Sequence, residues 1–477
     1  MPTTINLKPL LHRKQVEMCS PSPVASAAGV NVAKYYSSIM KKNFQAMLGS
    51  ATSAFWYSPD EDSWVSLPNP SLAGTFGAGA CSEIHPMGPN GQTALAGGTT
   101  LTLKTSLNIP ISLEGFPLRV TAGSGIGSNC FIESNTLGAN SIITVKSATP
   151  FLAATDATTI YTIFSGRYWV LNAGTIAAGI FKYFDYATQV WVNGGTSGLP
   201  ASWGTDGQLE GTNSGSGTIV TGTATGGTTN TLVTSNTWVT SNIWANFQVR
   251  ILSGTGIGQV RAIASSTTNT LTVSANWTVA PDATSVYSIE GNDDNLYLMG
   301  NNAVTLYKYS ISAGTWSVIT PTAARAAAPG LSASLNWISG CTHPSYKDAN
   351  GVSLAGRYMY SFRSGGVSNI DRFNLGTLAW DTVAAYGFSG ETFSTGSSFG
   401  YDGVNHMYVQ KDVTGRYFRF DIGKNMIEPF YTITYPQGAA VAGDKLWLTI
   451  FEDGSTRVPF IYSLLNSSTI MFRVLEF

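Results

Sequence analysis

The chain has 477 residues, of which only 11% are charged, and its formal net charge is -1. A balance this close to neutral gives no electrostatic reason to expect nucleic acid or an anionic membrane as a partner. Gly is abundant, with 51 residues, and aromatic residues make up 12% of the chain. This composition is typical of short strands joined by turns. A surface so poor in charge favours self-association, which suits a protein covered by its neighbours.

The cysteines and the start of the chain indicate where it folds. Cys19, Cys81, Cys130 and Cys341 are too few and too far apart for a disulfide scaffold. They fit a protein that folds in a reducing cytosol. The first residues show no signal-peptide pattern, and no apolar run approaches the ~18 residues of a membrane span. We therefore expect neither a leader nor a transmembrane segment.

The first 50 residues differ in composition from the rest. They combine a basic stretch, a Ser-Pro-Ser-Pro linker and one candidate short helix near Val32–Leu48. Two roles stay open for this segment: an arm that docks onto another subunit, or a tail that lies along its own domain. We assign 1–50 as an N-terminal docking arm.

Six aromatic hairpins follow along the chain. Each has an alternating strand, a short turn and a second strand, and they span 55–68, 180–192, 305–321, 369–383, 416–430 and 459–474. Alternation at period two predicts strands with one buried face. A further strand precedes five of the hairpins, at 167–171, 295–300, 357–362, 406–410 and 445–450. Units of three to four strands that stack on their neighbours predict an all-β fold, a β-propeller.

One of these hairpins carries a family resemblance. The segment FKYFDYATQVW (181–191) resembles the kelch repeat through Tyr183, Asp185, Thr188 and Trp191. The resemblance implies a kelch-like propeller in which a Tyr and a Trp at this spacing pack between blades. The residues at these positions are Tyr183, Trp191, Tyr309, Trp316 and Trp380. Because most repeats lack the Gly-Gly pair of the family, we expect about six blades, with five or seven as alternatives. Another antiparallel sandwich or barrel stays open.

A second, different repeat lies between the hairpins. Segment 118–163 aligns with 249–289: Arg119 matches Arg250, and the Gly-x-Gly-Ile-Gly run at 123–127 matches the run at 254–258. Asp-Ala-Thr at 156–158 matches 282–284 in the same order. Two copies of one small β module are therefore inserted into the propeller. The module resembles β-rich segments that recur in tailed-phage virion proteins.

The repeats define the expected layout of the chain. The docking arm is 1–50 and the first propeller segment is 51–89. Inserted module 1 is 90–164, a propeller blade is 165–213, inserted module 2 is 214–290, and the remaining blades are 291–477.

The sequence shows no catalytic motif. The Gly-Ser-Gly at 123–125 lacks the spacing of a nucleophile elbow and lies in a hairpin-like context. Cys81, His85, Cys341 and His343 form a set compatible with zinc. The other reading of this set is a small buried Cys and a hydrogen-bonded His near the propeller channel. We predict no catalytic, metal or cofactor site.

The functional expectation rests on the phage resemblance. We expect a non-enzymatic structural component of a tailed-phage virion, in the tail, the neck or the capsid, made in the host cytoplasm. Its partners would be other virion proteins and copies of itself. The alternative is a receptor- or glycan-binding head, for which Trp238 and Trp244 in the second module are candidate glycan or partner contacts. Packing inside the module is the other role open to these two residues.

Overall fold

The computed structural model describes residues 15–25, 31–37, 40–74, 76–77, 79–204, 207–214, 218–238, 240–300, 304–325, 336–337, 347, 355–362, 370–383, 398–411, 416–432, 445–453, 456–464, 469 and 471–475. Within these ranges the strands form six four-stranded sheets and two closed six-stranded barrels. All pairings within the sheets and barrels are antiparallel. The expected all-β class is confirmed.

The first three sheets contain the N-terminal strands and the hosts of both insertions. Sheet 1 holds β2 (Asn31–Ser37), β3 (Lys42–Ser50), β4 (Ser53–Ser58) and β5 (Ser63–Ser66). Sheet 2 holds β6 (Cys81–His85), β13 (Arg167–Leu171), β14 (Phe181–Asp185) and β15 (Val190–Asn193). Sheet 3 holds β16 (Gln208–Gly211), β23 (Asn295–Met299), β24 (Leu306–Ser310) and β25 (Thr315–Ile319).

The other three sheets complete the series. Sheet 4 holds β26 (Asn336–Trp337), β27 (Tyr358–Phe362), β28 (Ile370–Asn374) and β29 (Ala379–Val383), with the short 3-10 helix η3 (Ala355–Arg357) before β27. Sheet 5 holds β30 (Ser398–Tyr401), β31 (His406–Lys411), β32 (Arg416–Asp421) and β33 (Met426–Thr432). Sheet 6 holds β34 (Lys445–Asp453), β35 (Thr456–Leu464), β36 (Met471–Leu475) and β1 (Gln15–Met18).

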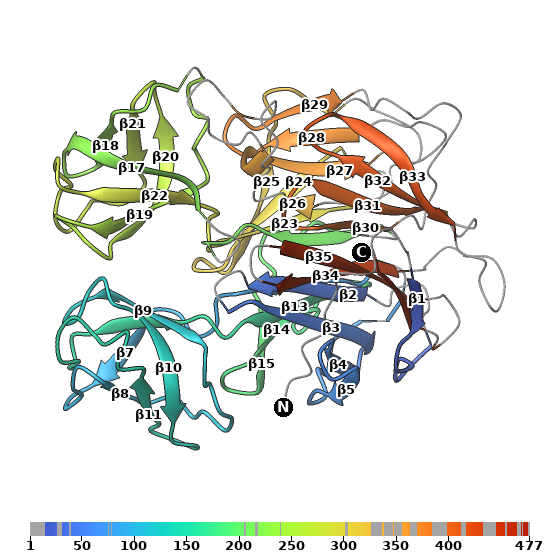
Figure 1. Cartoon of the computed structure of the whole chain (residues 1–477), viewed down its shortest axis with the longest axis horizontal. Coiled ribbons are helices and arrows are strands. Elements are labelled where there is room, and N and C mark those ends of the chain that lie inside the picture. The colour runs from blue at the N-terminus through green and yellow to red at the C-terminus, as the bar shows by residue number, and fades with distance from the viewer. Residues whose placement is uncertain are drawn as a thin grey trace.

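The six sheets are arranged around a common axis. Their first strands contact one another in a closed ring, in the order β34, β2, β6, β16, β26, β30 and back to β34. The other three strands of each sheet extend outward from this ring, which Figure 1 shows with the two barrels to one side. Such an arrangement is propeller-like. The six hairpins expected from the aromatic pattern are the strand pairs β4–β5, β14–β15, β24–β25, β28–β29, β32–β33 and β35–β36.

The N-terminal segment differs from the expectation. The helix predicted near Val32–Leu48 is wrong, because β2 and β3 pair over this range from Asn31–Leu48 to Ser37–Lys42. The docking arm assigned to 1–50 is also wrong from Gln15 onward, since β1 pairs with β36 as the outermost strand of sheet 6. Residues 1–14 lie outside the described residues. The Ala, Lys, Met and Leu residues between Val32 and Leu48 favour a helix locally, and pairing with neighbouring strands overrides that preference.

The two insertions are barrels with the same strand order. Barrel 1 holds β7 (Gln92–Leu95), β8 (Thr102–Thr105), β9 (Pro117–Ala122), β10 (Asn129–Asn135), β11 (Ile142–Val145) and β12 (Ile160–Ile163). Barrel 2 holds β17 (Thr218–Gly227), β18 (Thr231–Thr234), β19 (Gln248–Ser253), β20 (Val260–Ser266), β21 (Thr270–Val273) and β22 (Val286–Glu290). Each barrel interrupts one sheet between its first and second strands. The first module therefore belongs to sheet 2 and the second to sheet 3.

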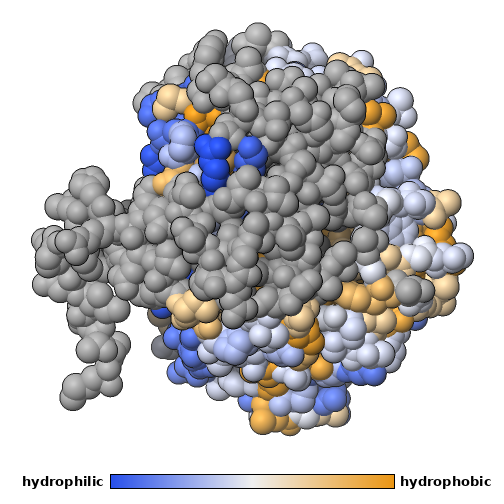
Figure 2. All heavy atoms as spheres, turned by 90° about the vertical axis from the view of Figure 1, so that its right-hand side faces the viewer, coloured by the Kyte–Doolittle hydropathy of each residue, from blue (hydrophilic) through white to orange (hydrophobic). Residues whose placement is uncertain are grey.

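Burial is extensive, yet apolar side chains also reach the surface. In Figure 2, which turns the right-hand side of Figure 1 to the viewer, apolar residues lie among polar ones over the lower part of the face. Exposed large apolar residues occur on the outermost strands of several sheets and on the barrels: Met18, Val65, Val190, Val192, Val318, Leu95, Leu101, Leu137, Ile142, Leu152 and Val279. Scattered exposed apolar residues are normal on soluble proteins, so they mark no site by themselves.

Candidate functional site

Three charged residues gather on the ring of first strands. Lys34 lies on β2, Glu83 on β6 and Glu210 on β16, and these three strands are consecutive in the ring. Glu83 pairs with Trp169 and Glu210 pairs with Tyr297, each the third residue of its sheet's second strand. The two carboxyl groups therefore occupy equivalent positions in adjacent sheets. We call Lys34, Glu83 and Glu210 the axial cluster.

The axial cluster is enclosed without being sealed. All three residues are half-buried. The backbone N–H of Trp337, on the next first strand β26, donates to Glu210 Oε1 at 2.9 Å. Lys34 Nζ is shielded from solvent, and among the described residues it has no hydrogen-bond partner. A shielded ammonium with no acceptor carries a large desolvation cost.

The three charges perturb one another. Burial lowers the pKa of Lys34, and Glu210 and Glu83 oppose that shift. Burial and the neighbouring Glu210 raise the pKa of Glu83 well above its usual value. Burial also raises the pKa of Glu210 to about 7, against the N–H of Trp337 and the charge of Lys34. Strongly perturbed groups that lie together are candidates for a functional site.

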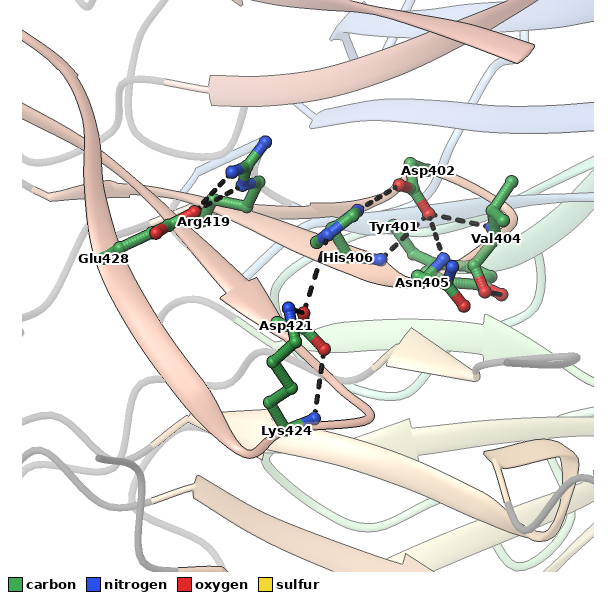
Figure 3. A network of polar contacts seen from close by, with 9 residues as sticks. All are labelled: Tyr401, Asp402, Val404, Asn405, His406, Arg419, Asp421, Lys424 and Glu428. Carbon is green, nitrogen blue, oxygen red and sulfur yellow. Dashed lines mark hydrogen bonds and ion pairs between the residues drawn. The ribbon is translucent and has the colours of Figure 1, made fainter. Parts of the chain in front are cut away.

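A second polar network lies at the turns of sheet 5 (Figure 3). Asp402 Oδ1 accepts the backbone N–H groups of Val404, Asn405 and His406 at 2.8, 2.9 and 3.0 Å. Its Oδ2 lies 3.0 Å from His406 Nδ1, and His406 Nε2 is 4.0 Å from Asp421 Oδ2. Burial would raise the pKa of Asp421, but its bonds to Lys424 and the nearby His406 hold it below the usual value.

The position of this network in the sheet indicates a structural role. His406 and Asp421 are directly opposite on the second and third strands. The same cross-strand position in sheet 2 holds Arg167 and Asp185, which form an ion pair at 3.0 Å. The histidine therefore lies between Asp402 and Asp421 of one sheet, at the position where an arginine pairs with an aspartate in another. Neither network was predicted from the sequence: the residues of the axial cluster are distant in the chain, and no motif marks the residues between Asp402 and Lys424.

The two parts of the duplicated motif, the Gly-x-Gly turn and the Asp-Ala-Thr turn, pack against each other within each barrel. A Cβ atom on Gly123 would collide with the backbone oxygen of Thr158, and one on Gly254 with that of Thr284. The Ser124 N–H donates to Thr158 Oγ1, and the Thr255 N–H donates to Thr284 Oγ1, both at 3.1 Å. The Gly-x-Gly turn and the Asp-Ala-Thr turn are thus one packed unit. This is why they are repeated together.

The two Gly-x-Gly-Ile-Gly turns also contact each other across the barrels. A Cβ atom on Gly127 would lie 2.7 Å from Ile257 Cγ1. In return, a Cβ atom on Gly258 would lie 2.5 Å from the Gly127 Cα and 2.9 Å from Ile126 Cγ1. The contact is reciprocal, with each Ile against the Gly of the other copy. We call it the turn pair.

Each barrel is also attached to the ring of sheets. In barrel 1 the Phe116 ring lies 6.1 Å from Phe44 of sheet 1 and 5.6 Å from Tyr186 beyond β14. In barrel 2 the Arg357 guanidinium lies over the Trp244 ring, 4.8 Å from the ring centroid. The Asn246 side chain donates to the Leu375 carbonyl at 2.9 Å. The barrels are therefore held both to the sheets and to one another.

The aromatic positions taken from the kelch resemblance lie at contacts between sheets. Tyr309, Trp316 and Trp380 are buried, whereas Tyr183 and Trp191 are half-buried. Trp191 Nε1 donates to the Pro68 carbonyl that follows sheet 1, at 2.7 Å. Trp316 Nε1 donates to the Gly195 carbonyl that follows sheet 2, at 3.1 Å. These two Trp residues of outermost strands thus bond to the segments that follow the preceding sheets.

The candidate glycan contacts are corrected by the structure. Trp238 is 2% exposed and Trp244 is fully buried. Their rings pack edge to face at 6.0 Å, and Trp244 also packs on Phe247. Neither ring can meet a glycan or a partner from this position. They fill the core between barrel 2 and the sheets.

The zinc-compatible set is described only in part. Cys341 and His343 lie outside the described residues. Cys81 and His85 are both buried on β6, four residues apart, which separates them by roughly 13 Å along a strand. Burial raises the pKa of the Cys81 thiol and lowers the pKa of His85 to about 3. In the part of the chain that the structure describes, no three His, Cys, Asp or Glu side chains gather as metal ligands.

The comparisons with known proteins give no family. No protein-family model matches the chain, and no curated protein matches it. A solved structure described as YCF48 bound to D1 peptide matches 98% of this chain and 96% of that chain, with 8% identity and a TM-score of 0.34. At that similarity the match supports no functional argument. Among the described residues, no helix has the length and apolarity to cross a membrane.

Proposed function

We propose that the chain is a non-enzymatic structural component of a tailed-phage virion, in its tail, neck or capsid. In this proposal the six sheets are the blades of a kelch-like propeller. The two barrels form a rigid head that contacts neighbouring subunits, which are other virion proteins and copies of the chain itself. The virion assignment rests on the resemblance carried by the duplicated module.

The turn pair is the observation that favours an assembly role. Two copies of one module sit on adjacent sheets and meet through the same turn, with Ile126 and Ile257 each against a glycine of the other copy. A module held at the sheets and at its twin presents its outer surface in a fixed orientation. Interfaces repeated over many copies gain strength from such preorganisation and from avidity.

The exposed apolar residues are consistent with covered surfaces. Leu137 and Leu152 of barrel 1 are 66% and 64% exposed, and Val65 and Val318 of the outermost strands are 56% and 59% exposed. The low charge of the chain, 11% of its residues, is what favours self-association, and contact with neighbours would remove these apolar side chains from water.

Mass spectrometry of particles separated into heads and tails tests the proposal. The chain should be present in one fraction at a fixed stoichiometry. Purified protein should also form a defined multimer or bind a protein of that fraction. Absence of the chain from purified particles, together with a monomer that binds no virion protein, would disprove the virion role. Deletion of residues 1–50 would not test docking, because it would remove the strands β1, β2 and β3 from the sheets.

The alternative function, a receptor- or glycan-binding head, loses the contacts first assigned to it. Trp238 and Trp244 are buried. A glycan would need another polar site.

A further inference from the structure

The outer face of barrel 1 carries three side chains in one row across its strands. Leu95 of β7 lies opposite Lys104 of β8, and Lys104 lies opposite Ile142 of β11. Each of the three is next to a buried residue along its strand, so alternation places all of them on the outside of the barrel. Leu95 is 40% exposed and Ile142 is 36% exposed. We call Leu95, Lys104 and Ile142 the lysine row.

Barrel 2 shows what the fold of the module requires at these positions. Its strands pair in the same order, and at the corresponding places Gly226 lies opposite Val233 and Val233 lies opposite Thr270. The second barrel thus forms with no charge in the row and with a Gly and a Thr in place of the Leu and the Ile. Folding of the module therefore does not explain the lysine row, whereas a contact outside the barrel does.

The lysine row lies on the side of barrel 1 that faces away from barrel 2. In the closed barrel β8 is opposite β9, and β9 ends next to the turn pair. Figure 1 shows β8 and β11 on the side of barrel 1 far from barrel 2. Leu137, which is 66% exposed, extends the row, because it follows Thr136, whose hydroxyl accepts the Ile142 N–H at 2.8 Å. Apolar side chains thus surround one ammonium on this face.

Lys104 selects the chemistry of anything that covers the lysine row. It forms no ion pair with a described residue. A lysine between apolar neighbours can bury its stem against them while its ammonium stays at the surface. Covering that ammonium without a partner is costly, so a docking surface has to bring a carboxylate together with apolar side chains.

The β4–β5 hairpin of sheet 1 has the complementary features. Its turn carries Asp60 and Glu61, which are exposed and form no ion pair with a described residue. Val65, on the second strand of this hairpin, is 56% exposed. The turn itself is held in place, because Asp62 accepts the Tyr57 hydroxyl at 2.7 Å. The hairpin therefore presents two carboxylates and an apolar side chain in a fixed shape.

We propose that the lysine row of barrel 1 binds the β4–β5 hairpin of a second copy of the chain, with Lys104 paired to Asp60 and Glu61. Figure 1 shows β5 and β8 far apart within one chain, so the contact joins two copies. It rests on the proposed assembly role, in which copies of the chain are neighbours. Because the two surfaces differ, the contact repeats head to tail, as a ring where the rotation closes and as a filament where it does not.

Charge reversal with rescue tests this pairing. In sedimentation-velocity ultracentrifugation the full-length wild type should form larger species as its concentration rises. Lys104→Glu should weaken association by at least about tenfold, and so should the double variant Asp60→Lys with Glu61→Lys. A mixture of these two proteins should associate again, because each reversed surface then meets its complement on the other chain. Recovery in the mixture also shows that both variants are folded.

Val233→Glu is the matched control, since it places the same acidic side chain at the position of barrel 2 that corresponds to Lys104. This variant should associate as the wild type does. An equal loss of association in Val233→Glu would assign the effect to added charge in general and would overturn the proposal.

Three further results would overturn it: a wild type that stays monomeric at every concentration, unchanged association in Lys104→Glu, or a mixture of the reversed variants that does not associate. Mass spectrometry of particles reports on the assembly role separately. A monomeric chain present in particles would refute this contact alone. Head-to-tail multimers of a chain absent from particles would refute the virion role alone.

Discussion

Replacement of Gly258 by alanine tests the turn pair directly. The new Cβ atom would lie 2.5 Å from the Gly127 Cα and 2.9 Å from Ile126 Cγ1, both in the other barrel. Backbone cannot rotate away as a side chain can. Gly258 also has a φ of +83°, where an L-residue costs about 1–2 kcal/mol. Overpacking adds about 1–3 kcal/mol. We therefore expect a total loss of about 2–5 kcal/mol.

Gly115→Ala is the matched control for this substitution. Gly115 has a φ of +82°, and a Cβ atom there would have nothing within 4 Å. It therefore measures the backbone cost alone, about 1–2 kcal/mol. The difference between the two variants isolates the contact between the barrels.

Hydrogen exchange of the full chain is the assay for both variants. In Gly258→Ala, amides of both turns, around Gly127 and Gly258, should exchange faster, although only one barrel carries the change. Ile126→Ala should partly relieve Gly258→Ala, because it removes one of the two colliding groups. Equal losses of stability in Gly258→Ala and Gly115→Ala, with no effect on the turn of barrel 1, would refute the turn pair.

Three further predictions concern the ring of sheets. Glu210 has a pKa of about 7 in the folded protein, against 4.5 when unfolded. Its protonated side chain therefore stabilises the fold fully below pH 4.5, and that stabilisation is lost as the pH rises to 7. In Glu210→Gln the free energy of unfolding, measured by urea denaturation, should fall by about 1–3 kcal/mol less between pH 5 and 8 than in the wild type. The same fall in both proteins would contradict this prediction. Trp316→Phe loses the hydrogen bond to the Gly195 carbonyl and should lower the free energy of unfolding, measured in urea, by about 1–2 kcal/mol. Unchanged stability would contradict a stabilising contact between the two sheets. Asp402→Ala should cost about 2 kcal/mol and speed amide exchange at 404–406 only; exchange as slow as in the wild type would exclude the turn role.

The hairpins could be predicted from the sequence because the pattern that indicates them is local. Alternating aromatic strands with turn residues between them define each hairpin within about 15 residues, and no distant partner is needed. The barrel motif was visible for a related reason, since an ordered match between two segments needs no structure. That the two copies touch through Ile126 and Ile257 was not predictable. Repetition in a sequence does not report contact in space.

The axial cluster and the N-terminal strands were missed for a physical reason. Lys34, Glu83 and Glu210 are single charged residues in short strands, and only the ring brings them together. The stretch from Asn31 to Ser50 lacks a Gly, Pro or Asn-Gly signal between its strands, and it contains several residues that favour helices. Pairing with neighbouring strands decides its structure. The buried Trp238 and Trp244 show the same limit, because exposure is a tertiary property.

The pairing of β1 with β36 has a consequence for biosynthesis. The strand Gln15–Met18 is made long before its partner Met471–Leu475. Sheet 6 therefore cannot be completed until β36 has been made, and the edge of β36 stays open until β1 pairs with it. An exposed edge invites a strand from another molecule. In a cell that makes many copies at once, pairing of β36 with β1 of its own chain competes with pairing to β1 of another chain. The rate of the first decides how many chains become linked by exchanged N-terminal strands.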